Sequence, residues 1–209
     1  CIRAAPGCVP STDRVDVTTS GAQPNNGVFN GTIPAITSDG RLVALASTAT
    51  NLVSENVNGV GNVYVRDTCT GAGGGCTPTT TLASLANDGS VGNCGSPSQG
   101  LAMSADGRFV AFDSIATNLT PDDNFAACSY EDIFVRDTCY GVASGCTPST
   151  VRVSVTSTPN PQTPGNSISG LPAISADGHY LVFLSAATNL APGVTGNGHT
   201  MVYLAKTGF

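Results

Sequence analysis

Basic, aromatic and imidazole side chains are scarce in this chain of 209 residues. It contains no Trp, two Met, two His and only eight Lys and Arg against 14 Asp and Glu, so its formal net charge is −6. Binding to the phosphates of nucleic acid requires clusters of cationic side chains, and so does attraction to an anionic membrane surface. The composition therefore argues against nucleic acid and against membrane surfaces as partners.

The motifs of common enzymes are missing as well. The sequence has no Gly-x-Ser-x-Gly, no His-Glu-x-x-His, no phosphate-binding glycine loop and no Cys-x-x-Cys-His for covalent haem. Of the two histidines, His179 and His199, the first occupies a position held by Arg41 and Arg108 in related segments, which indicates a turn residue. We expect no catalytic residue, no cofactor and no enzymatic activity.

Membrane-spanning and leader segments are also absent from the sequence, which has no signal peptide and no apolar run of about 18 residues. It begins at Cys1 without an initiating Met, for which the simplest explanation is a mature chain whose leader has been removed. Eight Cys together with 11% charged residues are typical of exported proteins. We predict an extracellular or cell-surface location.

Three copies of one repeat occupy the chain. Each copy has a Ser/Thr-x-Asp-Gly turn followed at once by an apolar run, and the turns lie about 70 residues apart, at Asp39, Asp106 and Asp177. Two further blocks follow each turn, an Ala-Thr-Asn-Leu segment and a short apolar segment that ends in Arg-Asp in the first two copies. These blocks begin at Ala49, Ala116 and Ala187, and at Val63, Ile133 and, in a weaker copy, Val202.

The local signals within each copy are those of β-structure. A short apolar run, an Asp-Gly turn and a second apolar run predict a tight hairpin. A third strand is expected at 62–67 of the first copy, and a fourth in the Thr/Val-rich stretches 79–83 and 149–155. The second strand is apolar at almost every position, which predicts neighbours on both faces of the sheet. We therefore predict an all-β fold of three four-stranded antiparallel propeller-type blades.

These blocks resemble a known repeat. The Ser-x-Asp-Gly-Arg turn with its apolar strand, as in 104–112, and the aromatic-containing strand ending in Arg-Asp, as in 133–137, are similar to the repeat of TolB-type, WD-like bacterial β-propellers. The resemblance covers essentially the whole chain and implies a propeller-type fold. It implies no particular function, because propellers host many unrelated activities. The chain departs from that family in a long, cysteine-bearing connection between the third and fourth strands.

The cysteines recur with the repeat. Three cysteine pairs lie at equivalent positions of the repeat, each with six residues between its members: Cys1 and Cys8, Cys69 and Cys76, Cys139 and Cys146. We predict a local disulfide in each pair. Cys94 and Cys128 remain, and a bridge between them is the most economical of the 105 pairings that eight cysteines allow. Metal binding is not favoured, because the spacing is wider than Cys-x-x-Cys and only two His are present.

The strands do not close into complete blades within the chain. Residues 11–17 align with the fourth-strand segment 149–155, whereas the last copy ends after its third strand. The expected organisation is a donor strand in 1–20, blades in 21–90 and 91–157, and a blade in 158–209 that lacks its own fourth strand. Three blades are too few for a closed ring, and an unfinished blade leaves an open sheet edge.

We therefore expect the N-terminal strand of one subunit to complete the third blade of another. The residues expected at this contact are Arg14, Val15, Val17, Val202, Tyr203 and Leu204. A head-to-tail contact either closes, here as a six-bladed ring of two chains, or propagates. The sequence favours a non-catalytic extracellular filament. The alternatives are a binding or enzyme-associated propeller module, as a ring or as a piece of a longer propeller protein.

Oxygen-rich loops of the first two copies are candidates for Ca²⁺. In the second copy the candidate ligands are Asp122, Asp123, Asn124 and Asp132. The equivalent loop of the third copy has no carboxylate, and turns stabilised by Asn and Asp side chains are the alternative explanation. The sequons at Asn30 and Asn118 permit glycan modification.

Overall fold

The computed structural model of the chain describes residues 11–28, 31–96, 100–122, 127–157, 162–195 and 199–209. Within these ranges the chain forms strands, turns and loops but no helix, and hence none able to cross a membrane. The strands are β1 (Ala35–Ile36), β2 (Leu42–Ser47), β3 (Asn62–Asp67), β4 (Thr79–Leu82), β5 (Leu101–Met103), β6 (Phe109–Ser114), β7 (Asp132–Asp137), β8 (Ser149–Arg152), β9 (Ser169–Ile174), β10 (Tyr180–Ser185) and β11 (Met201–Lys206).

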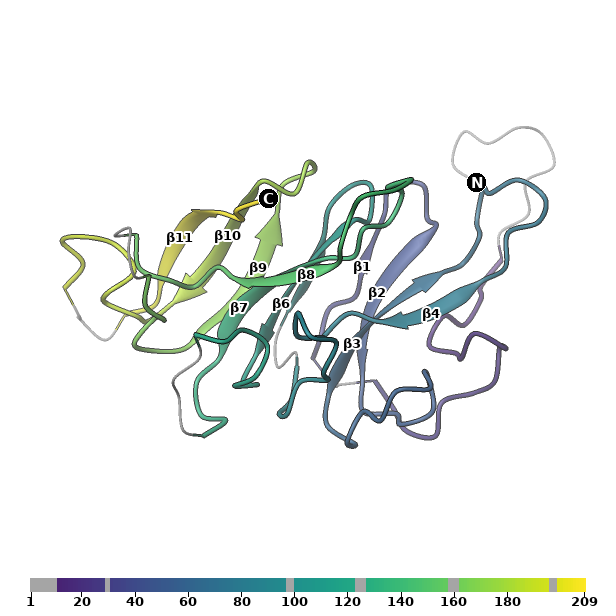
Figure 1. Cartoon of the computed structure of the whole chain (residues 1–209), viewed down its shortest axis with the longest axis horizontal. Coiled ribbons are helices and arrows are strands. Elements are labelled where there is room, and N and C mark those ends of the chain that lie inside the picture. The colour runs from purple at the N-terminus through teal and green to yellow at the C-terminus, as the bar shows by residue number, and fades with distance from the viewer. Residues whose placement is uncertain (1–10, 29–30, 97–99, 123–126, 158–161, 196–198) are drawn as a thin grey trace.

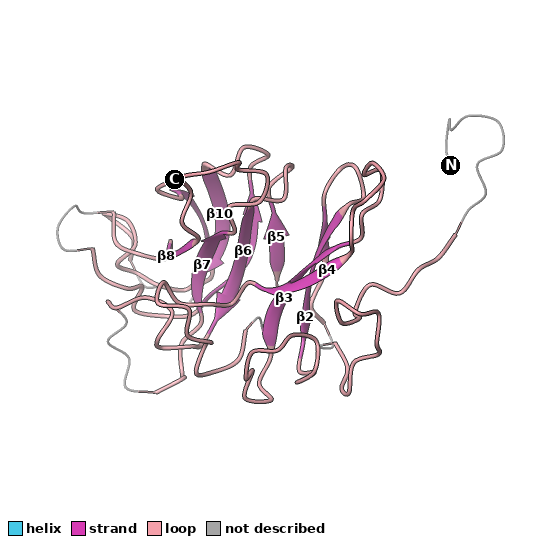
Figure 2. Ribbon diagram, turned by 45° about the vertical axis from the view of Figure 1, so that its right-hand side comes forward, coloured by secondary structure: helices cyan, strands magenta, loops and turns pink. Residues whose placement is uncertain are grey.

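The strands build three antiparallel sheets in chain order. The first has the order β1-β2-β3-β4, the second β5-β6-β7-β8, and the third β11-β10-β9. Figure 1 shows the sheets one after another along the long axis, with β4 near one end and β11 near the other. Figure 2 shows loops joining the strands at both ends of the sheets. This arrangement is consistent with propeller-type blades, two of them four-stranded and one three-stranded.

The Asp-Gly turn forms the hairpin between the first two strands of each sheet. The Asp39 carboxylate accepts hydrogen bonds from the Thr37 hydroxyl at 2.6 Å and from the Arg41 N–H at 3.0 Å. Gly40 has a φ of 78°, a conformation that residues with a Cβ rarely adopt. The same two hydrogen bonds recur in the other two copies, so one local motif sets the register of all three hairpins.

The core fills the space between consecutive sheets. Leu42, Ala44 and Val65 of the first sheet pack with Val110 and Phe112 of the second. On its other face the second sheet packs against the third in the same way, through a cluster that includes Phe109, Ala111, Ile133, Val135, Leu181 and Phe183. The second sheet is therefore covered on both faces, as its apolar sequence predicts.

The third sheet corrects that expectation. Every residue of β2 and β6 is buried, but burial alternates along β10, and the residues of β11 alternate between half-buried and exposed. The strand sequences are about equally apolar, so the difference comes from position. No described segment of the chain covers the outer face of the third sheet.

The N-terminal segment is irregular in the single chain. The donor strand expected within residues 1–20 requires a second subunit as its partner, and residues 11–20 contain no strand in the structure. A β-strand requires a hydrogen-bonded partner, and the chain offers this segment none along its first residues.

Three of the expected disulfides are present among the described residues. They join Cys69 to Cys76, Cys94 to Cys128 and Cys139 to Cys146. The predicted pair Cys1 and Cys8 lies outside the described residues. Three disulfides are consistent with an extracellular location.

Candidate assembly interface

The second sheet is clamped to the linker that arrives from the first sheet. After β4 the chain runs beside β8 of the second sheet. The side-chain oxygen of Asn87 accepts from the Thr150 N–H, and its amide donates to the Thr150 carbonyl at 3.2 Å. The Thr150 hydroxyl donates to the carbonyl of Leu85. Linker and fourth strand thus lie side by side.

Residues 17–19 make the same clamp on the first sheet. The Thr80 N–H donates to the Thr19 hydroxyl at 3.0 Å, and the Thr80 hydroxyl donates to the Val17 carbonyl at 2.6 Å. Val15 packs against the apolar cluster of Leu45 and Tyr64. Segment 15–19 is therefore folded as a linker that follows a fourth strand, although the described residues before it form no sheet.

The residues before this linker lack a partner strand. Ser11, Thr12 and Asp13 are exposed and irregular, yet they align with the β8 residues 149–151. Next to them, Arg14 and Asp16 pair through two hydrogen bonds of 2.6 and 3.0 Å. The hydrogen bond from Arg14 holds the pKa of the Asp16 carboxyl below its ordinary value. Segment 11–14 has the sequence of a fourth strand without a sheet.

The opposite end of the molecule has a sheet without a fourth strand. β11 pairs with β10 and forms the edge of its sheet. Beside this edge lies a groove of about 350 Å³, walled on one side by the linker after β8 and on the other by β11. Residues lining it include Val155, Ser157, Tyr203, Leu204 and Lys206. In the first two sheets the fourth strands β4 and β8 occupy the corresponding place, between linker and third strand.

The expected assembly residues of β11 point to different sides. Tyr203 faces the core, where its ring lies 5.7 Å from that of Phe183 and its hydroxyl donates to the Ala187 carbonyl. Val202 and Leu204 face outward and are each 71% exposed. On the N-terminal side, Val15 and Val17 belong to the linker and Arg14 to the unpaired segment.

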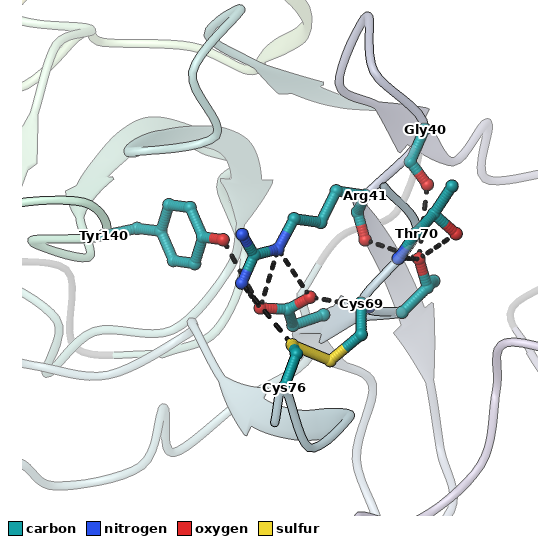
Figure 3. The surroundings of a disulfide bond; sticks show 8 residues. Gly40, Arg41, Cys69, Thr70, Cys76 and Tyr140 are labelled. Carbon is teal, nitrogen blue, oxygen red and sulfur yellow. Dashed lines mark hydrogen bonds and ion pairs between the residues drawn. A yellow bond between two sulfur atoms is a disulfide. The ribbon is translucent and has the colours of Figure 1, made fainter. Parts of the chain in front are cut away.

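A cystine and an ion pair secure the end of β3 (Figure 3). Arg41 binds Asp67 at 2.9 Å, and the Asp67 carboxylate also accepts from the N–H of Cys69. Tyr140 reaches across from the second sheet and donates to Asp67 at 3.3 Å. Arg108, Asp137 and Cys139 repeat the arrangement in the second sheet. The recurrence of these residue types is visible in the sequence, but their pairing and the contact of Tyr140 between sheets appear only in the structure.

Two of the candidate calcium ligands form salt bridges with an arginine of the chain. The buried Arg152 guanidinium lies 2.6 Å from the Asp122 carboxylate and 3.3 Å from that of Asp132. Positive charge at this place thus comes from the protein itself. Asp123 and Asn124 lie outside the described residues. The arrangement supports the alternative in which these acidic residues stabilise a loop.

The side chain of Asn118, the acceptor residue of one of the two sequons, is hydrogen-bonded within the chain. Its amide donates to the Val91 carbonyl at 2.9 Å, and its oxygen accepts from the Asn93 N–H. A glycan on this nitrogen would disrupt the contact with Val91. Asn30 lies outside the described residues.

Comparison with known proteins gives little further guidance. No protein-family model and no curated protein matches the chain. Among solved structures, TolB from Acinetobacter baumannii aligns with a TM-score of 0.27 and 14% identity, over 89% of this chain and 44% of the TolB chain. The chain thus spans less than half the length of that TolB, and the similarity is too low to assign a family or a function.

Proposed function

We propose that this chain is a non-catalytic, extracellular structural protein that assembles head to tail by exchange of a β-strand. Residues 11–14 of one copy form the fourth strand of the third sheet of the next. The observation that carries the proposal is the match between two half-sites, an unpaired fourth-strand segment beside a formed linker and an open groove beside β11. Main-chain hydrogen bonds supply much of the binding energy of such a contact.

The repeat sets the register of this contact. Thr80 pairs with Arg66 and Thr150 with Arg136, so Thr12 of the donor is expected opposite Ala205. In the same register the Thr12 N–H donates to the Ser157 hydroxyl and the Thr12 hydroxyl donates to the Val155 carbonyl. These contacts are the equivalents of the clamps that hold Thr80 and Thr150.

The charges fit this register. Arg14 takes the place of Arg152, whose counter-charges are Asp122 and Asp132. The third copy has Gly193 and Met201 at those two positions. Arg14 is neutralised instead by Asp16 of the adjoining linker in the same chain. The donor therefore brings its own counter-charge to a groove that has none at these positions, which avoids burying an unpaired cation.

The exchange requires a second copy, because segment 11–14 and β11 lie at opposite ends of the row of sheets (Figure 1). The contact is heterologous, so it gives either a closed ring or an open filament. We favour the filament, because repeating the sheet-to-sheet step beyond the chain extends the row and disulfides in successive units suit a polymer outside cells.

The test compares the full chain with a chain that lacks residues 1–14 but keeps the linker 15–19. Light scattering and negative-stain electron microscopy are expected to show fibres for the full chain and monomers for the truncated one. A synthetic peptide of residues 11–17 is expected to bind the truncated chain, and the same peptide with Thr12→Pro, which removes one N–H, serves as the matched control.

Other outcomes have clear meanings. A truncated chain that assembles as the full chain does contradicts strand exchange. Particles of twice the chain mass favour the two-chain ring. A full chain that stays monomeric and does not bind the peptide favours the binding or enzyme-associated module.

A further inference from the structure

Residues at equivalent positions of the repeat form both interfaces, the one between the first and second sheets and the one between the second and third. One face of the first sheet presents Leu42, Ala44, Val63 and Val65 to the second sheet. The second sheet presents the equivalent residues to the third, namely Phe109, Ala111, Ile133 and Val135. All eight are buried, with at most 8% exposure. This face is therefore the standard contact surface toward the following sheet.

In the third sheet the equivalent residues are apolar but uncovered. Tyr180 and Val182 of β10 are 46% and 37% exposed, and Val202 and Leu204 of β11 are each 71% exposed. None of the four is charged. Monomeric proteins seldom leave so many neighbouring apolar side chains on one sheet face without a partner.

The first sheet exposes one end of the complementary face. On this face Val43, Leu45 and Tyr64 are buried within the chain, whereas the end that carries Ile36 is open. Met103 of the second sheet and Ile174 of the third pack against the sheet before them, but the equivalent Ile36 is 64% exposed. The glycines of the Asp-Gly turns show the same difference between the first sheet and the other two. Gly107 sits against the Leu42 side chain of the preceding sheet and Gly178 against Phe109, whereas Gly40 has no such neighbour.

We propose that the outer face of the third sheet binds the Ile36 face of the first sheet of a second copy, as a face-to-face contact in addition to the exchanged strand. The inference rests on the proposed function and deepens it. In this contact the Gly40 turn of one copy sits on Tyr180 of the other, as Gly107 sits on Leu42. Val202 and Leu204 become buried like Val63 and Val65. The occupant is a second copy because the uncovered outer face of the third sheet and the uncovered Ile36 end of the first sheet belong to the two faces that the internal sheets join.

The inference predicts a specific pair of neighbours. Between the second and third sheets the Ala105 N–H donates to the Ala176 carbonyl at 3.0 Å. Ser38 and Ala105 occupy the same position of the repeat. In the proposed contact Ala176 of one copy therefore lies beside Ser38 of the next. Both residues are exposed in the single chain, so cysteines placed there leave the fold intact.

The experiment mixes a Ser38→Cys chain with an Ala176→Cys chain and treats them with a short bifunctional thiol reagent. The mixture is expected to form covalent dimers, whereas either variant alone forms none. An Ala105→Cys/Ala176→Cys chain, which joins positions already adjacent, serves as the positive control and is expected to react within one chain.

A second variant measures the contribution of the face. Leu204→Asp places a charge on the outer face and is expected to raise the concentration needed for assembly by at least about tenfold. Val142→Asp is the matched control, since Val142 is 38% exposed but lies in the loop closed by Cys139 and Cys146. It is expected to change this concentration by less than about twofold.

The outcomes separate the two proposals. If the full chain polymerises, yet the mixed variants give no dimer and Leu204→Asp has no effect, the face contact is wrong and strand exchange stands. If polymers form and dimers appear even after strand exchange is blocked by removal of residues 1–14, the face contact stands alone. A full chain that neither polymerises nor crosslinks contradicts both.

Discussion

The second and third sheets have nearly the same sequence pattern and opposite surroundings. Ile133 and Val135 of the second sheet are fully buried against the third sheet, whereas Val202 and Leu204 at the equivalent positions of the third are 71% exposed. The apolar character of a strand therefore indicates which surroundings the strand fits, and these can include the surface of another chain. In the third sheet these surroundings are incomplete, and we attribute the missing part to a second copy.

The largest effect is expected from the shared core. Phe134→Ala removes a fully buried ring and leaves a cavity between two sheets, which costs about 3–5 kcal/mol of unfolding free energy. Leu204→Ala in the monomeric chain lacking residues 1–14 is expected to cost less than about 0.5 kcal/mol. Urea denaturation measures both. Equal losses would contradict the difference in surroundings.

A smaller effect is expected from the cystine of the second sheet. Cys139→Ser with Cys146→Ser removes a bridge between residues seven positions apart and is expected to lower the unfolding free energy by about 2–3 kcal/mol. The third sheet has Gly208 at the position of Cys139, so hydrogen exchange in β11 should stay the same. Thermal denaturation and amide exchange provide the two readouts.

The linker clamps allow a matched comparison of the two sheets. Asn87→Ala leaves the buried Thr150 N–H without its side-chain acceptor and is expected to destabilise the monomer by about 1–2 kcal/mol. Ser157→Ala changes the equivalent residue at the open groove. It is expected to leave monomer stability unchanged and to weaken assembly. A loss of monomer stability in both variants would mean that the groove already has an occupant in the chain.

The smallest effect concerns acid. Burial alone raises the pKa of Asp137, but hydrogen bonds from Arg108 and the Cys139 N–H outweigh burial and lower the pKa below its ordinary value. Because the folded-state pKa is depressed, this stabilisation is fully present above the unfolded pKa of about 3.9 and disappears as the pH falls through the folded pKa. Lys206 and His179 replace this pair in the third copy.

Asp137→Asn is expected to unfold at a lower temperature than the native chain above about pH 4 and to converge with it in stronger acid. His179→Asn should show no such convergence. Thermal melts across this range measure both variants, and parallel curves for Asp137→Asn would contradict the role of the carboxylate.

Much of the fold could be predicted from local sequence signals. The Asp-Gly turns at Asp39, Asp106 and Asp177 set three hairpins because a carboxylate and a glycine act within a few residues. The cysteine pairs with six residues between them follow from the repeat. The contact of Tyr140 with Asp67 and the neutralisation of Asp122 by Arg152 were not predictable, because the partners lie far apart in sequence. The first contact joins two sheets, and the second joins a loop to β8 of the same sheet.

The sequence by itself determined the repeat, the β-strands, the local disulfides and the fourth-strand pattern of residues 11–14, since all of these depend on residue order over short distances. Only the tertiary structure decided that residues 15–19 fold as a linker while 11–14 stay unpaired, and that the outer face of the third sheet is uncovered. These features depend on which sheet lies next to which, and burial is a property of neighbours rather than of the strand alone.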